Sequence, residues 1–353
     1  MTTSRKAASR RVAALASGLL LLGGLPAPAQ PLADFYRGKT ITMIVGPAPG
    51  GNYDMAARLV GRFLVKYLPG QPTLVVQNMP GAGGIAAINH MYNLAPKDGT
   101  AIAVMQRAMP QIAYLGDPAI RFDPNRFTYL GTMSSYAGDA FPLFIMADRP
   151  VKSWTDIKPG SGKKIVLGAV GSGSTNLTFP LIAKSALHLN IDIIRGYSGA
   201  SAIYLAMQSG EVDGQAAGFA SILAAQKSLW DAGKFRVLIQ FGRTTRLPAL
   251  ADVPTGQELA TNDADRALIA FAEAPFFMAM PFIAPPDLPA ERAAALQQAF
   301  DRACADPAFR EEAKKFDLDV SPLRGAEVAK LVRDMAGTPP AVVAQFKAIA
   351  ESH

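Results

Sequence analysis

The sequence predicts an α/β protein with two lobes, each built on a parallel sheet. The chain has 353 residues, half of them hydrophobic, and at roughly 100–200 residues per domain this length suggests two domains. Short apolar runs alternate with segments of helical period, as they do in strand–helix–strand units. Each half of the chain also contains one apolar strand that leads through a glycine-rich loop into a helix. We therefore expect two lobes with matching loops.

In the first half, the β-branched run at 41–45 is a strand candidate. A segment with i, i+4 apolar spacing follows it and predicts a helix with one buried face. This helix is expected over 55–68. After it we expect a strand over 74–76, a helix that follows 81–84 and ends at Pro96, and a strand over 101–105.

The second half repeats the pattern: a strand at 165–170, a loop at 171–176 and a helix at 177–189. A helix from about 198 to 210 and a run at 212–217 complete the lobe. From Pro289 onward the pattern is helical with proline stops, which predicts helices without a strand, packed back onto one lobe that also holds the other chain end. The expected domains are 30–131 plus 275–353, and 132–274. We expect extended crossing segments near 127–134 and 276–283.

The first 29 residues have the order of a secretory signal peptide. Basic residues stand at 5, 6, 10 and 11, an apolar run covers 12–25, and Ala27-Pro28-Ala29 predicts cleavage after Ala29. The apolar run is shorter than the ~20 residues of a membrane-spanning helix, which disfavours an uncleaved anchor. Removal of four basic residues takes the net charge from +7 to 7 − 4 = +3. We expect an exported, periplasmic protein that does not bind nucleic acid.

The sequence offers little for catalysis. One cysteine, Cys304, and three histidines provide no disulfide and no metal-ligand spacing. The nucleophile and zinc motifs of common hydrolases are missing. The segment Gly81–Ala86 fits the G-x-G-x-x-A pattern, but it lacks the acidic residue expected after a dinucleotide-binding loop. We expect a protein that is not an enzyme and has no cofactor and no metal.

The two glycine-rich loops, 46–54 and 171–176, are the candidate ligand site. Helix N-termini carry unpaired N–H groups and partial positive charge, so they attract anions. For either loop alone, a tight strand-to-helix turn is the favoured interpretation, but matching loops in two lobes favour a carboxylate site between them. Asp54 is expected to cap its helix rather than contact an anion. The loop residues expected to bind the ligand are Ala48, Gly50, Gly51, Asn52, Ser172, Ser174, Thr175 and Asn176.

Several blocks together resemble the receptors of tripartite tricarboxylate transporters, the Bug-type extracytoplasmic solute receptors. The blocks that carry the resemblance are Ile41–Val45 with Pro49-Gly50-Gly51, Val76–Gly84, Pro96–Thr100, Gly171–Thr175 and Gly210–Asp213. The resemblance implies a type II periplasmic-binding fold, a small organic acid as ligand, a tripartite tricarboxylate membrane permease as partner, and a monomer. A receptor that acts on a signalling partner instead of a transporter is the alternative.

Three further residues are candidates for ligand binding. Tyr197 stands where the chain has Gly-Tyr-Ser-Gly in place of the family's P-Y-K-G. Asp213 is either structural or a partner for an amine, if the ligand is an amino acid. Arg107 follows the expected strand at 101–105, and the carboxyl ends of parallel strands border the ligand crevice. Arg107 is either a surface residue or a bidentate partner for a second carboxylate of a di- or tricarboxylate.

Overall fold

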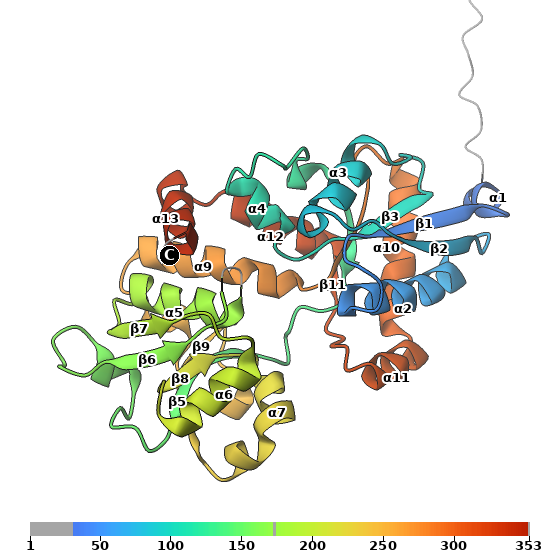
Figure 1. Ribbon diagram of the computed structural model, residues 1–353. Coiled ribbons are helices and arrows are strands. Elements are labelled where there is room, and N and C mark those ends of the chain that lie inside the picture. The colour runs from blue at the N-terminus through green and yellow to red at the C-terminus, as the bar shows by residue number, and fades with distance from the viewer. Residues whose placement is uncertain (1–30, 172–173, 352–353) are drawn as a thin grey trace, which may run out of the picture. The chain divides into compact units, whose positions relative to one another are not determined.

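The computed structural model describes residues 31–171 and 174–351. It shows an α/β fold with two separate sheets, one in each lobe (Figure 1). The predicted signal peptide and its cleavage after Ala29 lie outside the described residues.

The first sheet has the order β11-β4-β10-β3-β1-β2. Its β1 pairs in parallel with β2 and β3, as the alternating pattern predicts, whereas β10, β4 and β11 join antiparallel. Met43 on one face of β1 and Ile44 on the other are both buried, because helices cover both faces of the sheet. The strands of this sheet are β1 Thr40–Val45, β2 Thr73–Asn78, β3 Ala101–Val104, β4 Thr128–Thr132, β10 Pro281–Ala284 and β11 Leu323–Arg324.

The second sheet has the order β7-β6-β8-β5-β9. Here β6 pairs in parallel with β7 and β8, while β5 runs antiparallel to β8 and β9. Both sheets are therefore mixed and not purely parallel, because the chain enters each sheet from the other lobe through an antiparallel strand. The strands are β5 Phe141–Met146, β6 Ile165–Gly168, β7 Ile191–Ile194, β8 Gly214–Ala216 and β9 Phe235–Phe241.

Helices cover the faces of the two sheets (Figure 1). The longer ones are amphipathic, and α2 buries Leu59, Val60 and Leu64 along one side. In chain order the α-helices are α1 Leu32–Tyr36, α2 Asn52–Tyr67, α3 Ile85–Asn93, α4 Met109–Tyr114, α5 Thr175–Ala186, α6 Ala200–Ser209, α7 Phe219–Asp231, α8 Gly256–Leu259, α9 Asp263–Glu273, α10 Ala290–Ala305, α11 Pro307–Lys315, α12 Gly325–Ala336 and α13 Pro340–Glu351.

Two neighbouring segments of chain cross between the sheets. One follows β4 and leads to β5, and the other follows α9 through the 3₁₀ segment Ala274–Met278 to β10. They are hydrogen bonded to each other, because the Met133 N–H donates to the Met280 carbonyl at 3.2 Å and the Ala279 N–H donates to the Ser134 carbonyl at 2.9 Å. The first crossing lies between β4 and β5 and the second passes through a 3₁₀ segment, so they overlap only in part with the extended segments expected near 127–134 and 276–283. The domain boundaries stay a prediction.

The C-terminal tail differs from its prediction in two ways. It contains a short strand, β11, which pairs with β4. The tail also divides: α10 packs on α2 and β4, and α12 packs on β4, but α13 packs on α5 and α9 of the other lobe. The expectation of a strandless tail on a single lobe was wrong. Its helical period was correct, but a helical period does not show which surface each helix covers.

Within residues 31–171 and 174–351, no helix is both long enough and apolar enough to cross a membrane. In the same ranges, no cluster of histidine, cysteine, aspartate or glutamate side chains has an arrangement that would hold a metal ion.

Candidate functional site

A cavity of about 230 Å³ lies where the two lobes meet. Arg107 and α4 come from the first lobe, α5 and α9 from the second, and α13 and the 3₁₀ segment before β10 complete the walls. The cavity brings together two of the candidate residues, Arg107 and Thr175. The other described candidates do not line it.

Arg107 is a half-buried cation held in place by aromatic groups. Its backbone N–H donates to the Tyr53 hydroxyl at 3.2 Å, and its guanidinium donates to the Tyr136 hydroxyl at 3.4 Å. The guanidinium carbon lies 4.4 Å from the centre of the Phe276 ring. No carboxylate of the described residues pairs with it. A cation that has aromatic partners but no anionic one can pair with an anionic ligand.

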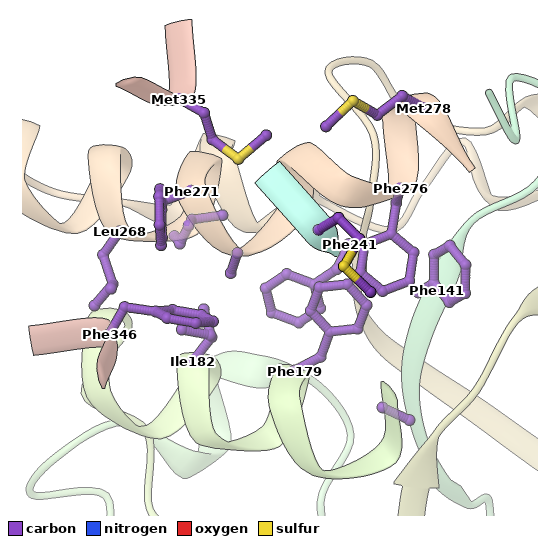
Figure 2. Close-up of a cluster of buried hydrophobic side chains, with 14 of the residues drawn as sticks. Phe141, Phe179, Ile182, Phe241, Leu268, Phe271, Phe276, Met278, Met335 and Phe346 are labelled. Carbon is purple, nitrogen blue, oxygen red and sulfur yellow. The ribbon is translucent and has the colours of Figure 1, made fainter. Parts of the chain in front are cut away.

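The ring under Arg107 belongs to an aromatic cluster that joins the second crossing segment to the second lobe. Phe276 packs edge-on against Phe141 with ring centres 4.4 Å apart and lies 5.0 Å from Phe179. Phe179 stacks on Phe241 at 4.9 Å (Figure 2). Because close-packed rings leave little room for movement, the position of the Phe276 ring is fixed. Arg107 therefore rests on a rigid surface.

The first glycine-rich loop is fastened by one buried carboxylate. Asp54 is 3% exposed and accepts hydrogen bonds from the Gly50 N–H, from Asn78 Nδ2 and from two nitrogens of Arg58, all at 3.0 Å. Asn78 Nδ2 also donates to the Pro47 carbonyl at 3.0 Å. The bonds from Arg58 are the main reason that the pKa of Asp54 is lowered to about 2, although burial opposes the shift. Asp54 is therefore an anion that shapes the loop.

Four candidates of the first loop, Ala48, Gly50, Gly51 and Asn52, are exposed and lie outside the cavity lining. The residue that caps α2 is Gly51, and no described side chain bonds to the first free N–H groups of this helix. Those groups remain available to an anion. The loop is linked to the cavity by Tyr53, whose hydroxyl donates to the Ala279 carbonyl at 3.1 Å and accepts from the Arg107 N–H.

Two neutral side chains fasten the described part of the second loop. The Ser174 hydroxyl donates its proton to the Gly171 carbonyl at 2.6 Å, and Asn176 Oδ1 accepts from the Val170 N–H at 3.2 Å. In this arrangement Ser174 has no proton left for a ligand. Ser172 lies outside the described residues.

Thr175 is the first residue of α5 and borders the cavity. No partner of its hydroxyl is found among the described residues, so its proton can be donated to a ligand. Thr178, one turn later, donates its own hydroxyl to the Ser174 carbonyl at 3.0 Å. Both threonines border the cavity, but the Thr178 hydroxyl is bonded to the helix backbone and no bond of the Thr175 hydroxyl is found among the described residues.

Tyr197 and Asp213 lie away from the cavity. The Tyr197 hydroxyl donates to Glu211 at 2.5 Å, and burial is the main cause that raises the pKa of Tyr197 to about 12. Asp213 accepts from the Val166 N–H at 2.7 Å and pairs with Arg149 at 3.2 Å. Because Asp213 precedes β8, it lies at the opposite end of the parallel strands from the second loop. The structure does not bring either side chain to Arg107.

Sequence reasoning missed the residues that position the arginine. Tyr53, Tyr136 and Phe276 come from three distant segments, and only the fold brings them together. A signal was available for Tyr53, which belongs to the first glycine-rich loop. No signal in the sequence singled out Phe276 among the 18 phenylalanines.

Known proteins resemble this chain in sequence and in fold. The sequence model of the family described as tripartite tricarboxylate transporter family receptor matches residues 56–347. The chain is 27% identical to the UPF0065 protein in the gbd 5′ region of Cupriavidus necator over 344 residues, which covers 94% of each chain.

Solved structures share the fold. A TctC solute-binding protein from Polaromonas, without ligand, matches with a TM-score of 0.68 at 19% identity, over 89% of this chain and 98% of that one. MatC from Rhodopseudomonas palustris, with bound malate, matches with a TM-score of 0.50 at 20% identity, over 89% and 99%. The fold is therefore the two-lobed fold of periplasmic binding proteins, as predicted.

Proposed function

Because the chain belongs to the tripartite tricarboxylate transporter receptor family, we propose that it is an exported receptor that captures a small organic carboxylate between its lobes. The observation that carries the proposal is the pair of Arg107 and Thr175 in one cavity. Arg107 supplies a fixed positive charge, and Thr175 supplies a hydroxyl donor. The described residues provide no carboxylate partner for Arg107. Binding of malate by MatC is in keeping with this ligand class.

The two residues reach the cavity from different lobes. A carboxylate that contacts both joins the lobes, so ligand binding favours their closed arrangement. Arg107 forms charge-assisted hydrogen bonds to the carboxylate oxygens, and the Thr175 hydroxyl donates a third. The free N–H groups at the start of α2 provide a second, weaker place for negative charge.

The compartment, oligomeric state and partner that we propose come from the sequence. The protein acts in the periplasm after cleavage behind Ala29, as a monomer, and presents the ligand to the permease subunits of a tripartite tricarboxylate transporter. Because its family is one of receptors, we propose no catalytic step, no cofactor and no nucleic-acid partner.

Thermal unfolding of the purified protein tests the proposal. A ligand that binds the native state alone stabilises it by RT ln(1 + [L]/Kd), about 2.7 kcal/mol at a hundredfold excess over Kd. We expect mono- or dicarboxylic acids to raise the melting temperature, and sugars and nucleotides to leave it unchanged. A shift with a sugar or nucleotide and none with any acid would overturn the proposal.

A further inference from the structure

The cavity beyond Arg107 is apolar, and this bears on which carboxylate fits. Its polar lining side chains other than Arg107 and Thr175 have partners within the protein: Gln111 donates to the Phe271 carbonyl at 2.6 Å, and Thr178 donates to the Ser174 carbonyl. The remaining lining side chains are aliphatic or aromatic. They include Ile112, Leu115, Leu177, Leu181, Ala272 and Phe346.

From Arg107 and Thr175, the cavity continues along apolar side chains of two helices. Thr175 opens α5 and Leu181 lies six residues later, roughly 9 Å along the helix axis. Arg107 precedes α4, and Leu115 follows it. The Leu115 end is closed by α13, because Lys347 Nζ donates to the Leu115 carbonyl at 3.2 Å and Phe346 packs edge-on against Phe271 at 5.2 Å (Figure 2).

We propose that the ligand is an acid with one carboxylate and an apolar body, with the carboxylate on Arg107 and Thr175 and the body in the apolar end of the cavity. This inference rests on the proposed function. The volume of about 230 Å³ is sufficient, because an apolar cavity of ~150 Å³ holds benzene. A second carboxylate at the apolar end would lose its water. The cation nearest to that end in the contacts above, Lys347, is exposed, does not line the cavity and is already bonded to the Leu115 carbonyl, which disfavours a diacid.

Titration of the purified protein with straight-chain acids from butanoate to octanoate tests the inference. Each buried methylene group is expected to raise affinity about fourfold until the cavity is filled. Adipate has as many carbons as hexanoate but a second carboxylate at the far end, and we expect it to bind more weakly than hexanoate. Affinity that does not rise with chain length, or tighter binding of adipate, would overturn the inference while the proposed function stands.

Two variants connect the effect to this cavity. Ala272→Leu adds bulk to the wall formed by α9 and is expected to move the best-binding acid to a shorter chain, whereas Ala270→Leu, on the exposed side of the same helix, leaves the series unchanged. Leu115→Asn is at a half-exposed position and is expected to reduce the gain per methylene group. Thermal unfolding verifies that each variant is folded. An unchanged series in the folded variants would overturn the inference, and a protein that binds no carboxylate would overturn the proposed function with it.

Discussion

The two glycine-rich loops occupy matching places in their lobes, yet different chemistry holds them. The first is fastened by a buried anion, Asp54, which gathers donors from Gly50, Asn78 and Arg58. In the second, the Ser174 hydroxyl and the Asn176 amide, both neutral, hold the described part of the loop. The same order of strand, loop and helix can therefore be held in place by different chemistry. This difference predicts that the loops respond differently to substitution and to pH.

Substitution of Asp54, the charged group that holds the first loop, should have the largest effect on stability. Asp54→Ala leaves the Gly50 N–H and Asn78 Nδ2 without their acceptor, and we expect a loss of about 3 kcal/mol in the free energy of unfolding, since hydrogen bonds to charged groups contribute ~1.5–3 kcal/mol each. Urea unfolding measures it. Asp34→Ala removes an exposed ion pair with Arg37 and serves as control, with an expected loss below about 1 kcal/mol. Equal losses in the two variants would show that the buried carboxylate has no special role.

In the second loop, we expect one substitution to weaken ligand binding and another to lower stability. Thr175→Ala removes a donor that faces the cavity, and we expect affinity for the best acid to fall about ten- to hundredfold with little change in melting temperature. Ser174→Ala removes the bond to the Gly171 carbonyl, and we expect about 1 kcal/mol less stability and a smaller change in affinity. Calorimetry and thermal unfolding of both variants measure this. The opposite pattern would show that Ser174 and not Thr175 contacts the ligand.

The smallest expected effect is the pH dependence of the stability that Asp54 contributes. The folded-state pKa of Asp54, about 2, is below its usual 3.8, so its contribution is present above pH 3.8 and is lost as pH falls toward 2. We expect the stability difference between the wild type and Asp54→Ala to shrink by about 1 kcal/mol between pH 6 and pH 3. The difference between the wild type and Ser174→Ala should stay constant, because no charge is involved. A difference for Asp54→Ala that did not change with pH would contradict the lowered pKa.

The parts that local pattern determines were predictable from the sequence. The apolar run before the first loop is β1, and the strand expected before Arg107 is β3. The rule that ligands bind at the carboxyl ends of parallel strands made Arg107 a candidate, and its role in binding stays a prediction. The direction of the Ser174 hydroxyl was not predictable, because a hydroxyl in a loop can bond to the backbone or to a ligand. The crossing of α13 to the other lobe depends on long-range packing, and so does the placement of Phe276 under Arg107.

The central claim is that the cavity recognises a carboxylate through Arg107, and a comparison of an acid with its amide tests it most directly. The acid that raises the melting temperature most is titrated by calorimetry against the wild type and Arg107→Gln, together with the corresponding neutral amide. We predict that the wild type binds the acid at least ~tenfold more tightly than the amide and that Arg107→Gln loses this preference. Equal binding of acid and amide by the wild type, or a preference that survives in Arg107→Gln, would contradict the claim.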